Sequence, residues 1–137
     1  VVLANMAPGN QLELLEQCNA PNRFVLADTM DLWIDIAREQ LERVLMQIDL
    51  LVINETEARE YAGTTNLVEA GALLRAKGPK YVVIKLGEFG ALGIVGIAAL
   101  RCRRNGNRGK RQGSATPRGR CNQIAPEAHR LRPIRSL

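Results

Sequence analysis

The chain has few of the residues that build disulfide-stapled or membrane-spanning proteins. Its three cysteines, Cys18, Cys102 and Cys121, are an odd count without a Cys-x-x-Cys pair, so they support neither a disulfide framework nor a zinc module. The longest apolar run, residues 90–100, is too short to span a bilayer. Residues 1–11 lack the basic start of a secretory signal. We therefore expect no membrane association and a cytoplasmic location.

Aromatic residues make up only 4% of the chain, and none lies in residues 101–137, where positive charge gathers. Residues 1–100 hold 8 basic and 13 acidic residues, a net charge of −5, whereas residues 101–137 hold 11 and 1, a net charge of +10. A segment of this charge could neutralise several phosphates of RNA or DNA. Without aromatic side chains it offers no platform on which bases stack. Nucleic-acid binding is therefore the weaker alternative for this chain.

Short apolar runs alternate with helical stripes along the first 95 residues. The expected strands cover residues 1–4, 23–27, 50–53 and 81–86, and the expected helices cover residues 11–18, 32–48, 55–62 and 67–77. Continuous apolar strands are typical of parallel sheets buried on both faces. We therefore predict an α/β fold with a mostly parallel sheet and right-handed crossovers. Residues 91–95 begin a return strand after a turn.

The third expected strand leads directly into a helix, and Asn54 and Glu57 lie at this junction. Their spacing is that of a capping box, in which the Asn54 side chain bonds the Glu57 backbone and Glu57 bonds back. In open α/β sheets ligands bind outside the carboxyl ends of the strands, and helix N-termini there favour phosphate. The pair therefore has a second interpretation, as polar groups beside a metal and phosphate site. The two interpretations are compatible.

Two other strand ends carry candidate site residues. Asp28 follows the second strand. Either Asp28 or Asp31 could cap the next helix, and otherwise Asp28 is a polar group at the sheet edge. Lys85, Gly87 and Gly90 follow the fourth strand, where two glycines three apart are typical of a hairpin turn. Glycines also let a backbone approach a phosphate closely, and Lys85 would add a positive charge there.

Three stretches together resemble one enzyme family. Val52-Ile-Asn-Glu-Thr-Glu57 resembles the Asn-x-x-Glu motif of the ribokinase-like, or PfkB, carbohydrate kinases. Residues 24–34 look like the strand and turn that precede this motif in the family. Tyr81-Val-Val-Ile-Lys-Leu-Gly-Glu-Phe-Gly-Ala-Leu92 looks like its strand and glycine loop beside ATP. The resemblance covers residues 1 to 92 and includes the spacing between the three stretches.

This resemblance implies a three-layer αβα fold of which the chain holds an incomplete part. It implies ATP and Mg²⁺ as cofactors and a hydroxyl of a sugar or a nucleoside as the phosphate acceptor. Asn54 and Glu57 would order the magnesium ion and its waters. Lys85, Gly87 and Gly90 would line the nucleotide. Asp28 would lie at the rim of the nucleotide and substrate cleft.

The chain departs from the family where the chemistry should be. The family signature Gly-Ala-Gly-Asp supplies an anion hole and the Asp that takes the proton from the attacking hydroxyl. No Asp occurs in this sequence after Asp49, so no residue of the chain is assigned as the catalytic base. The family's N-terminal half, which holds most sugar-binding residues and a lid, also has no counterpart here. We expect the isolated chain to be inactive.

The pattern of strands and helices stops near residue 95. We therefore divide the chain into a partial kinase domain, residues 1–95, and a basic tail of low order, residues 96–137. The abrupt loss of pattern within a hairpin, together with the arginine enrichment, leads to the hypothesis that the tail is translated out of frame; a genuine tail is the alternative. A Gly-Ala-Gly-Asp stretch downstream of Leu92 in either of the other two reading frames would support the frameshift. Its absence from both of those frames would refute it.

A different class of function also fits the pattern. An incomplete sheet exposes strand edges, and exposed edges recruit partner chains. The chain would then be a non-catalytic α/β module that forms a homo-oligomer or binds nucleic acid or another chain through its basic tail.

Overall fold

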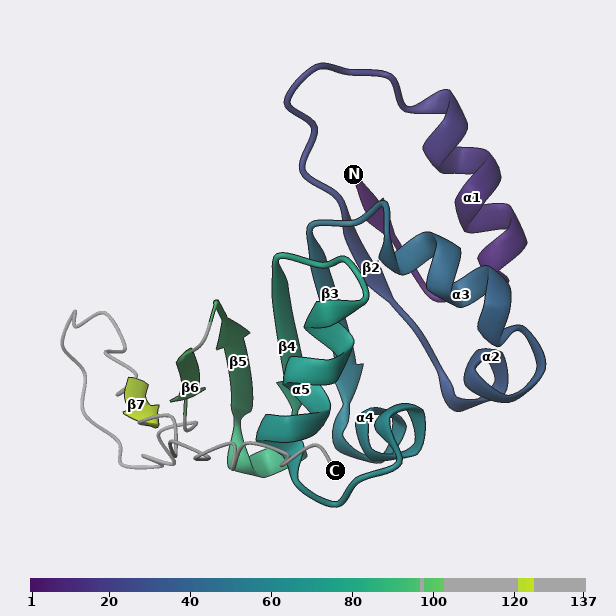
Figure 1. Ribbon diagram of the computed structural model, residues 1–137. Helices are drawn as coiled ribbons and strands as arrows, with labels where there is room; N and C mark the ends of the chain where they lie inside the picture. The colour runs from purple at the N-terminus through teal and green to yellow at the C-terminus, as the bar shows by residue number, and fades with distance from the viewer. Residues whose placement is uncertain (97, 103–120, 125–137) are drawn as a thin grey trace, which may run out of the picture.

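The computed structural model describes residues 1–96, 98–102 and, for their backbone, 121–124. Within these residues one sheet has its strands in chain order (Figure 1). The strands are β1 (Val2–Leu3), β2 (Leu26–Asp28), β3 (Leu50–Asn54), β4 (Tyr81–Lys85), β5 (Ala91–Val95), β6 (Ala98–Cys102) and β7 (Cys121–Ile124). Strands β1 to β4 are parallel, whereas β5, β6 and β7 each run antiparallel to the strand before. The predicted parallel sheet with a return strand is confirmed.

The helices connect neighbouring parallel strands. They are α1 (Pro8–Gln17), α2 (Asp31–Ile36), α3 (Arg38–Leu45), α4 (Glu55–Ala62) and α5 (Leu67–Ala76), with a short 3₁₀ helix, η1 (Gly87–Phe89). Right-handed crossovers between strands in consecutive order place all such helices on one face of the sheet. Figure 1 shows α4 and α5 packed in front of β3 and β4. None of the helices in the described ranges is long and apolar enough to cross a membrane.

Burial alternates along the central strands. In β3, Leu51 and Ile53 are buried under the helices, while Leu50, Val52 and Asn54 are only half-buried on the opposite face. The described residues therefore supply two of the three layers expected for the fold, the sheet and the helices on one face. The core lies between these two layers, and its largest fully buried apolar side chains are Leu3, Leu15, Leu45, Leu51, Ile53, Leu74, Ile84, Val25, Val44 and Val82.

The predicted long helix over residues 32–48 is wrong, because it is two helices that break at Ala37. Ala37 has φ −136° and ψ 31°, outside the helical region. Leu32 and Ile36, two apolar residues of this range, are 44% and 68% exposed, so they do not belong to a buried helix face. Ile36 and Leu41 are five residues apart, which places them about 140° apart around one helix. In the structure only Leu41 of the two is buried.

Two expectations about the end of the chain also change. Residues 98–102 lie in the segment expected to have low order, yet they form β6 and pair with β5 over five residues. The cysteine count gave no support for a disulfide, yet Cys102 is disulfide-bonded. Residues 103–120 and 125–137, which hold most of the expected tail, lie outside the described residues.

Candidate functional site

The carboxyl ends of β2, β3 and β4 bring four predicted site residues to one edge of the sheet. Asn54 on β3 and Lys85 on β4 are register partners. Asp28, at the end of β2, lies opposite Val52 on β3. Lys85 Nζ is 3.5 Å from Asp28 Oδ1, so the side chains reach across β3. Glu57, in the first turn of α4 directly after β3, is the fourth residue. The four lie together because the carboxyl ends of parallel strands share one edge of the sheet.

Asn54 and Glu57 form the predicted capping box at the start of α4. The Glu57 backbone N–H donates to Asn54 Oδ1 at 2.9 Å, and the Asn54 backbone N–H donates to Glu57 Oε2 at 3.1 Å. Among the described residues, no hydrogen bond uses the Asn54 side-chain nitrogen or the second Glu57 oxygen. The box therefore fixes both side chains and still leaves a donor and an acceptor for a ligand.

Glu57 is the most buried acid of the site, with only 7% of its surface exposed. Burial raises the pKa of its carboxyl, and the nearby Asp28 and Asp31 raise it further, while the Asn54 N–H and the Lys85 charge act against them. Ionising Glu57 in this place is thus unfavourable without added positive charge. A cation beside Glu57 would stabilise its charged form.

The polar side chains at this edge suit a hydrated Mg²⁺ ion better than a metal bound entirely by protein ligands. No group of three or more His, Cys, Asp or Glu side chains in the described part of the chain is placed to hold a metal ion. Mg²⁺ in nucleotide sites keeps several waters and uses one or two carboxylates with the substrate phosphates. Glu57 and Asn54 fit that role: the second Glu57 oxygen could bind the ion or accept hydrogen bonds from its waters, and the Asn54 amide NH₂ could donate to a phosphate oxygen.

Residues 85–90 form the predicted hairpin turn between β4 and β5. Leu86 N–H donates to Gly90 O at 2.9 Å and closes the loop. Gly87 has φ 56° and Gly90 has φ 97° with ψ −133°, a conformation that needs glycine. A Cβ at Gly87 would meet nothing within 4 Å, so the backbone there is open to a ligand.

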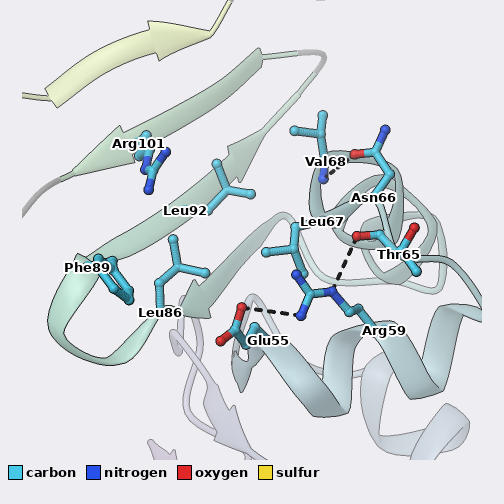
Figure 2. A pocket seen from close by; sticks show the side chains of 10 residues that line it. All are labelled: Glu55, Arg59, Thr65, Asn66, Leu67, Val68, Leu86, Phe89, Leu92 and Arg101. Atoms are coloured by element: carbon cyan, nitrogen blue, oxygen red, sulfur yellow. Dashed lines mark hydrogen bonds and ion pairs between the residues drawn. The ribbon is translucent and has the colours of Figure 1, made fainter.

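A pocket of about 470 Å³ opens on the other side of this loop, and sequence reasoning missed it. Figure 2 shows the hairpin on one side and the start of α4 and α5 on the other. Its lining residues are Glu55, Arg59, Thr65, Asn66, Leu67, Val68, Leu86, Phe89, Leu92 and Arg101. The available signal was the pair Glu55 and Arg59, whose (i, i+4) spacing predicts an ion pair on one helix face; their atoms lie 3.3 Å apart.

Comparison with known proteins decides the family. The pfkB carbohydrate kinase family matches residues 3–104 of the chain. The chain belongs to this family. The match bears out the resemblance seen in residues 1 to 92 and continues through β6. Among curated proteins, none matches at a significant level.

Solved kinase structures share the fold of this PfkB-family chain. A PfkB protein from Polaromonas sp. JS666 has a TM-score of 0.62 at 20% identity, over 74% of this chain and 40% of its own. Pyridoxal kinase from Staphylococcus aureus in complex with AMP-PCP has a TM-score of 0.61 at 15% identity, over 75% and 45%. Adenosine kinase from Anopheles gambiae has a TM-score of 0.56 at 22% identity, over 68% and 33%. The chain thus spans less than half the length of each of these proteins.

Proposed function

We propose that this chain is the nucleotide-binding part of an ATP-dependent kinase that phosphorylates a hydroxyl of a sugar or a nucleoside. The observation that carries the proposal is the capping box of Asn54 and Glu57 at the carboxyl edge of the sheet, with Lys85 beside it. Membership of the family supports the kinase lineage. The box presents a buried carboxylate where an α/β sheet binds its ligands.

Each site residue has a role in this proposal. Asn54 and Glu57 order Mg²⁺ and its waters, which supply charge stabilisation to the phosphates. Lys85 binds a phosphate. Its contact with Asp28 is 3.5 Å long, and the Lys85 and Asp28 side chains are 47% and 36% exposed, so this ion pair is weak. Gly87 and Gly90 bring the hairpin backbone close to the nucleotide. Asp28, once released from Lys85, lies at the rim of the acceptor cleft.

The proposal separates binding from turnover. Phosphoryl transfer depends on positioning and on electrostatic stabilisation of the transferred group. The chain offers both to a bound nucleotide, but no Asp follows Asp49 in its sequence to take the acceptor's proton. We therefore expect the chain to bind magnesium nucleotide without transferring phosphate.

Titration calorimetry of the full chain with AMP-PCP, with and without Mg²⁺, tests this function. Glu57→Gln is the informative variant, because the amide oxygen of glutamine can still accept from the Asn54 N–H while the charge is lost. We expect the wild type to bind the magnesium complex more tightly than the free nucleotide. The variant should lose most of this Mg²⁺ dependence, a change of about tenfold, the size of one charged hydrogen bond.

Glu69→Gln is the matched control, because Glu69 occupies the same position of α5 but is exposed. It should bind like the wild type. Binding by Glu57→Gln that keeps the full Mg²⁺ dependence would refute the metal role of Glu57 and leave the capping box as its only function.

A further inference from the structure

The C-terminal end of α4 is capped by a side chain from another helix. Arg38, the first residue of α3, donates from Nη2 to the Tyr61 carbonyl oxygen at 2.7 Å. The last four carbonyls of a helix lack an N–H partner within the helix, and Tyr61 carries one of them. A cation at this end also interacts favourably with the helix dipole. Arg38 therefore does for the end of α4 what the capping box does for its start.

The same guanidinium lies over the Tyr61 ring, with its central carbon 4.4 Å from the ring centroid. Tyr61 is only 4% exposed, so its ring is held in the core. A planar guanidinium can stack on a ring and donate to a nearby oxygen at the same time, which the ammonium group of lysine cannot do. The contact therefore fixes both the position and the orientation of this helix end.

A second hydrogen bond links Tyr61 to α3. The Tyr61 hydroxyl donates to Glu42 Oε1 at 3.1 Å, and Lys77 Nζ donates to the same oxygen at 3.0 Å. Burial and the Glu42 charge raise the pKa of Tyr61 to about 12, so the hydroxyl keeps its proton and remains a donor. This bond can be removed without changing the ring or the carbonyl that Arg38 contacts, so the two links can be tested separately.

The contact with Arg38 lies one helical turn from the capping box. Tyr61 and Glu57 are four residues apart in α4, so they lie on the same face of the helix. The helix has only 8 residues, about two turns. A shift at its C-terminal end therefore reaches the first turn, where Glu57 is held. Side chains that bind a ligand depend on the surrounding structure to hold them in position.

We propose that Arg38 is a positioning residue for Glu57: by holding the end of α4, it keeps the Glu57 carboxylate in place for Mg²⁺. The inference rests on the proposed function, which gives Glu57 its ligand. It also gives the helix break at Ala37 a consequence, because the break makes Arg38 the first residue of a new helix. Arg38 lies outside the three stretches that resemble the family, so the resemblance assigns it no role.

Arg38→Lys tests this role, because it keeps the positive charge and loses the planar contact with the ring and the carbonyl. In calorimetric titration of the full chain with AMP-PCP, the gain in affinity from Mg²⁺ should fall by about threefold or more, within the range for residues that act on a site through packing. Amide hydrogen exchange without any ligand should be faster at the Glu57 N–H by a similar factor. This increase should exceed that of the slowest amides of β3 and β4, which report global unfolding.

Two variants serve as controls. Arg43→Lys is the matched one, because Arg43 lies on the same helix but is exposed, and it should change neither measurement. Tyr61→Phe removes only the hydroxyl bond to Glu42. It should lower the urea concentration at the midpoint of unfolding and leave the Mg²⁺ dependence of binding at the wild-type level.

The two measurements separate this role from the proposed function. Faster exchange at the Glu57 N–H in Arg38→Lys, in a chain that binds AMP-PCP without any Mg²⁺ dependence, would support the positioning role and refute the metal role of Glu57. Exchange and Mg²⁺ dependence that both match the wild type would overturn the positioning role, whatever the loss of stability. An equal effect of Tyr61→Phe on both measurements would also overturn it, because a general loss of stability would then explain the result.

Discussion

The segments Asn54-Glu-Thr-Glu57 and Asn66-Leu-Val-Glu69 carry the same Asn-x-x-Glu pattern, and each starts a helix. Both asparagines accept hydrogen bonds from the first turn of their helices. At α4 the acid bonds back to the backbone of its asparagine. At α5 Glu69 instead accepts a 2.8 Å hydrogen bond from the Thr64 hydroxyl.

The difference between the two segments comes from what precedes each asparagine. Asn54 ends β3, between two parallel neighbours, and Glu57 is buried there. Asn66 ends a turn on the surface, and both Asn66 and Glu69 are exposed. The motif alone therefore specifies a helix start, while its position at the carboxyl edge of the sheet puts the first copy where α/β sheets bind ligands. We propose that the start of α4 serves the ligand site, whereas α5 packs on the sheet.

The largest expected effect is a loss of stability when the close packing of α5 on the sheet is disturbed. A Cβ on Gly71 would overlap the Ile94 side chain on β5, because the glycine lets the helix lie directly on the sheet. Gly71→Val should lower the free energy of unfolding by about 1–3 kcal/mol, the range for overpacking a core. Urea denaturation measures the loss.

Gly9→Val is the matched control, because Gly9 also lies in a helix, α1, but a Cβ there would meet nothing closer than Gln40 Oε1 at 3.6 Å. Equal losses in the two variants would show that the close contact between α5 and β5 does not support the fold.

The second prediction compares the two caps directly. Asn54→Ala removes an acceptor and leaves the buried Glu57 N–H unpaired, so it should lower the free energy of unfolding by about 1–2 kcal/mol. Asn66→Ala exposes its helix start to water and should cost about 0.5–1 kcal/mol. Thermal unfolding of both variants measures the difference. An equal loss of stability in the two variants, or a larger loss in Asn66→Ala, would show that the two caps do not differ as proposed.

The sequence predicted the sheet well because β3 and β4 are short apolar runs rich in β-branched residues, which favour a buried strand over a helix. The capping box was predictable for a similar reason, since its bonds are local. The break at Ala37 was not predicted, because the stripe was read as one helix through Ile36. The pocket could not be predicted, since Arg59, Phe89 and Arg101 come from separate segments and meet only through tertiary packing.

The smallest effect concerns the charge of Glu57. Its folded-state pKa is raised, chiefly by burial, so the folded state holds the proton to a higher pH than the unfolded chain does. Stability from this group is therefore complete at low pH and is lost as pH rises from the unfolded pKa of about 4.3 through the folded value. The Glu57→Gln side chain cannot ionise and keeps the capping box. The free energy of unfolding of the variant should therefore increase relative to that of the wild type as pH rises from about 4 to 7.

Guanidinium denaturation of both proteins across this pH range measures that gain, with Glu69→Gln run alongside to report the loss of an exposed charge from the matching helix position. A gain confined to Glu57→Gln identifies an acid that is held uncharged at some cost to the fold. Added Mg²⁺ should then shrink the gain at neutral pH, because the cation stabilises the ionised wild-type carboxylate and has no charge to bind in the variant. A pH-independent difference would mean that Glu57 is solvated like a surface acid, and α4 and α5 would then be two copies of one ordinary helix start.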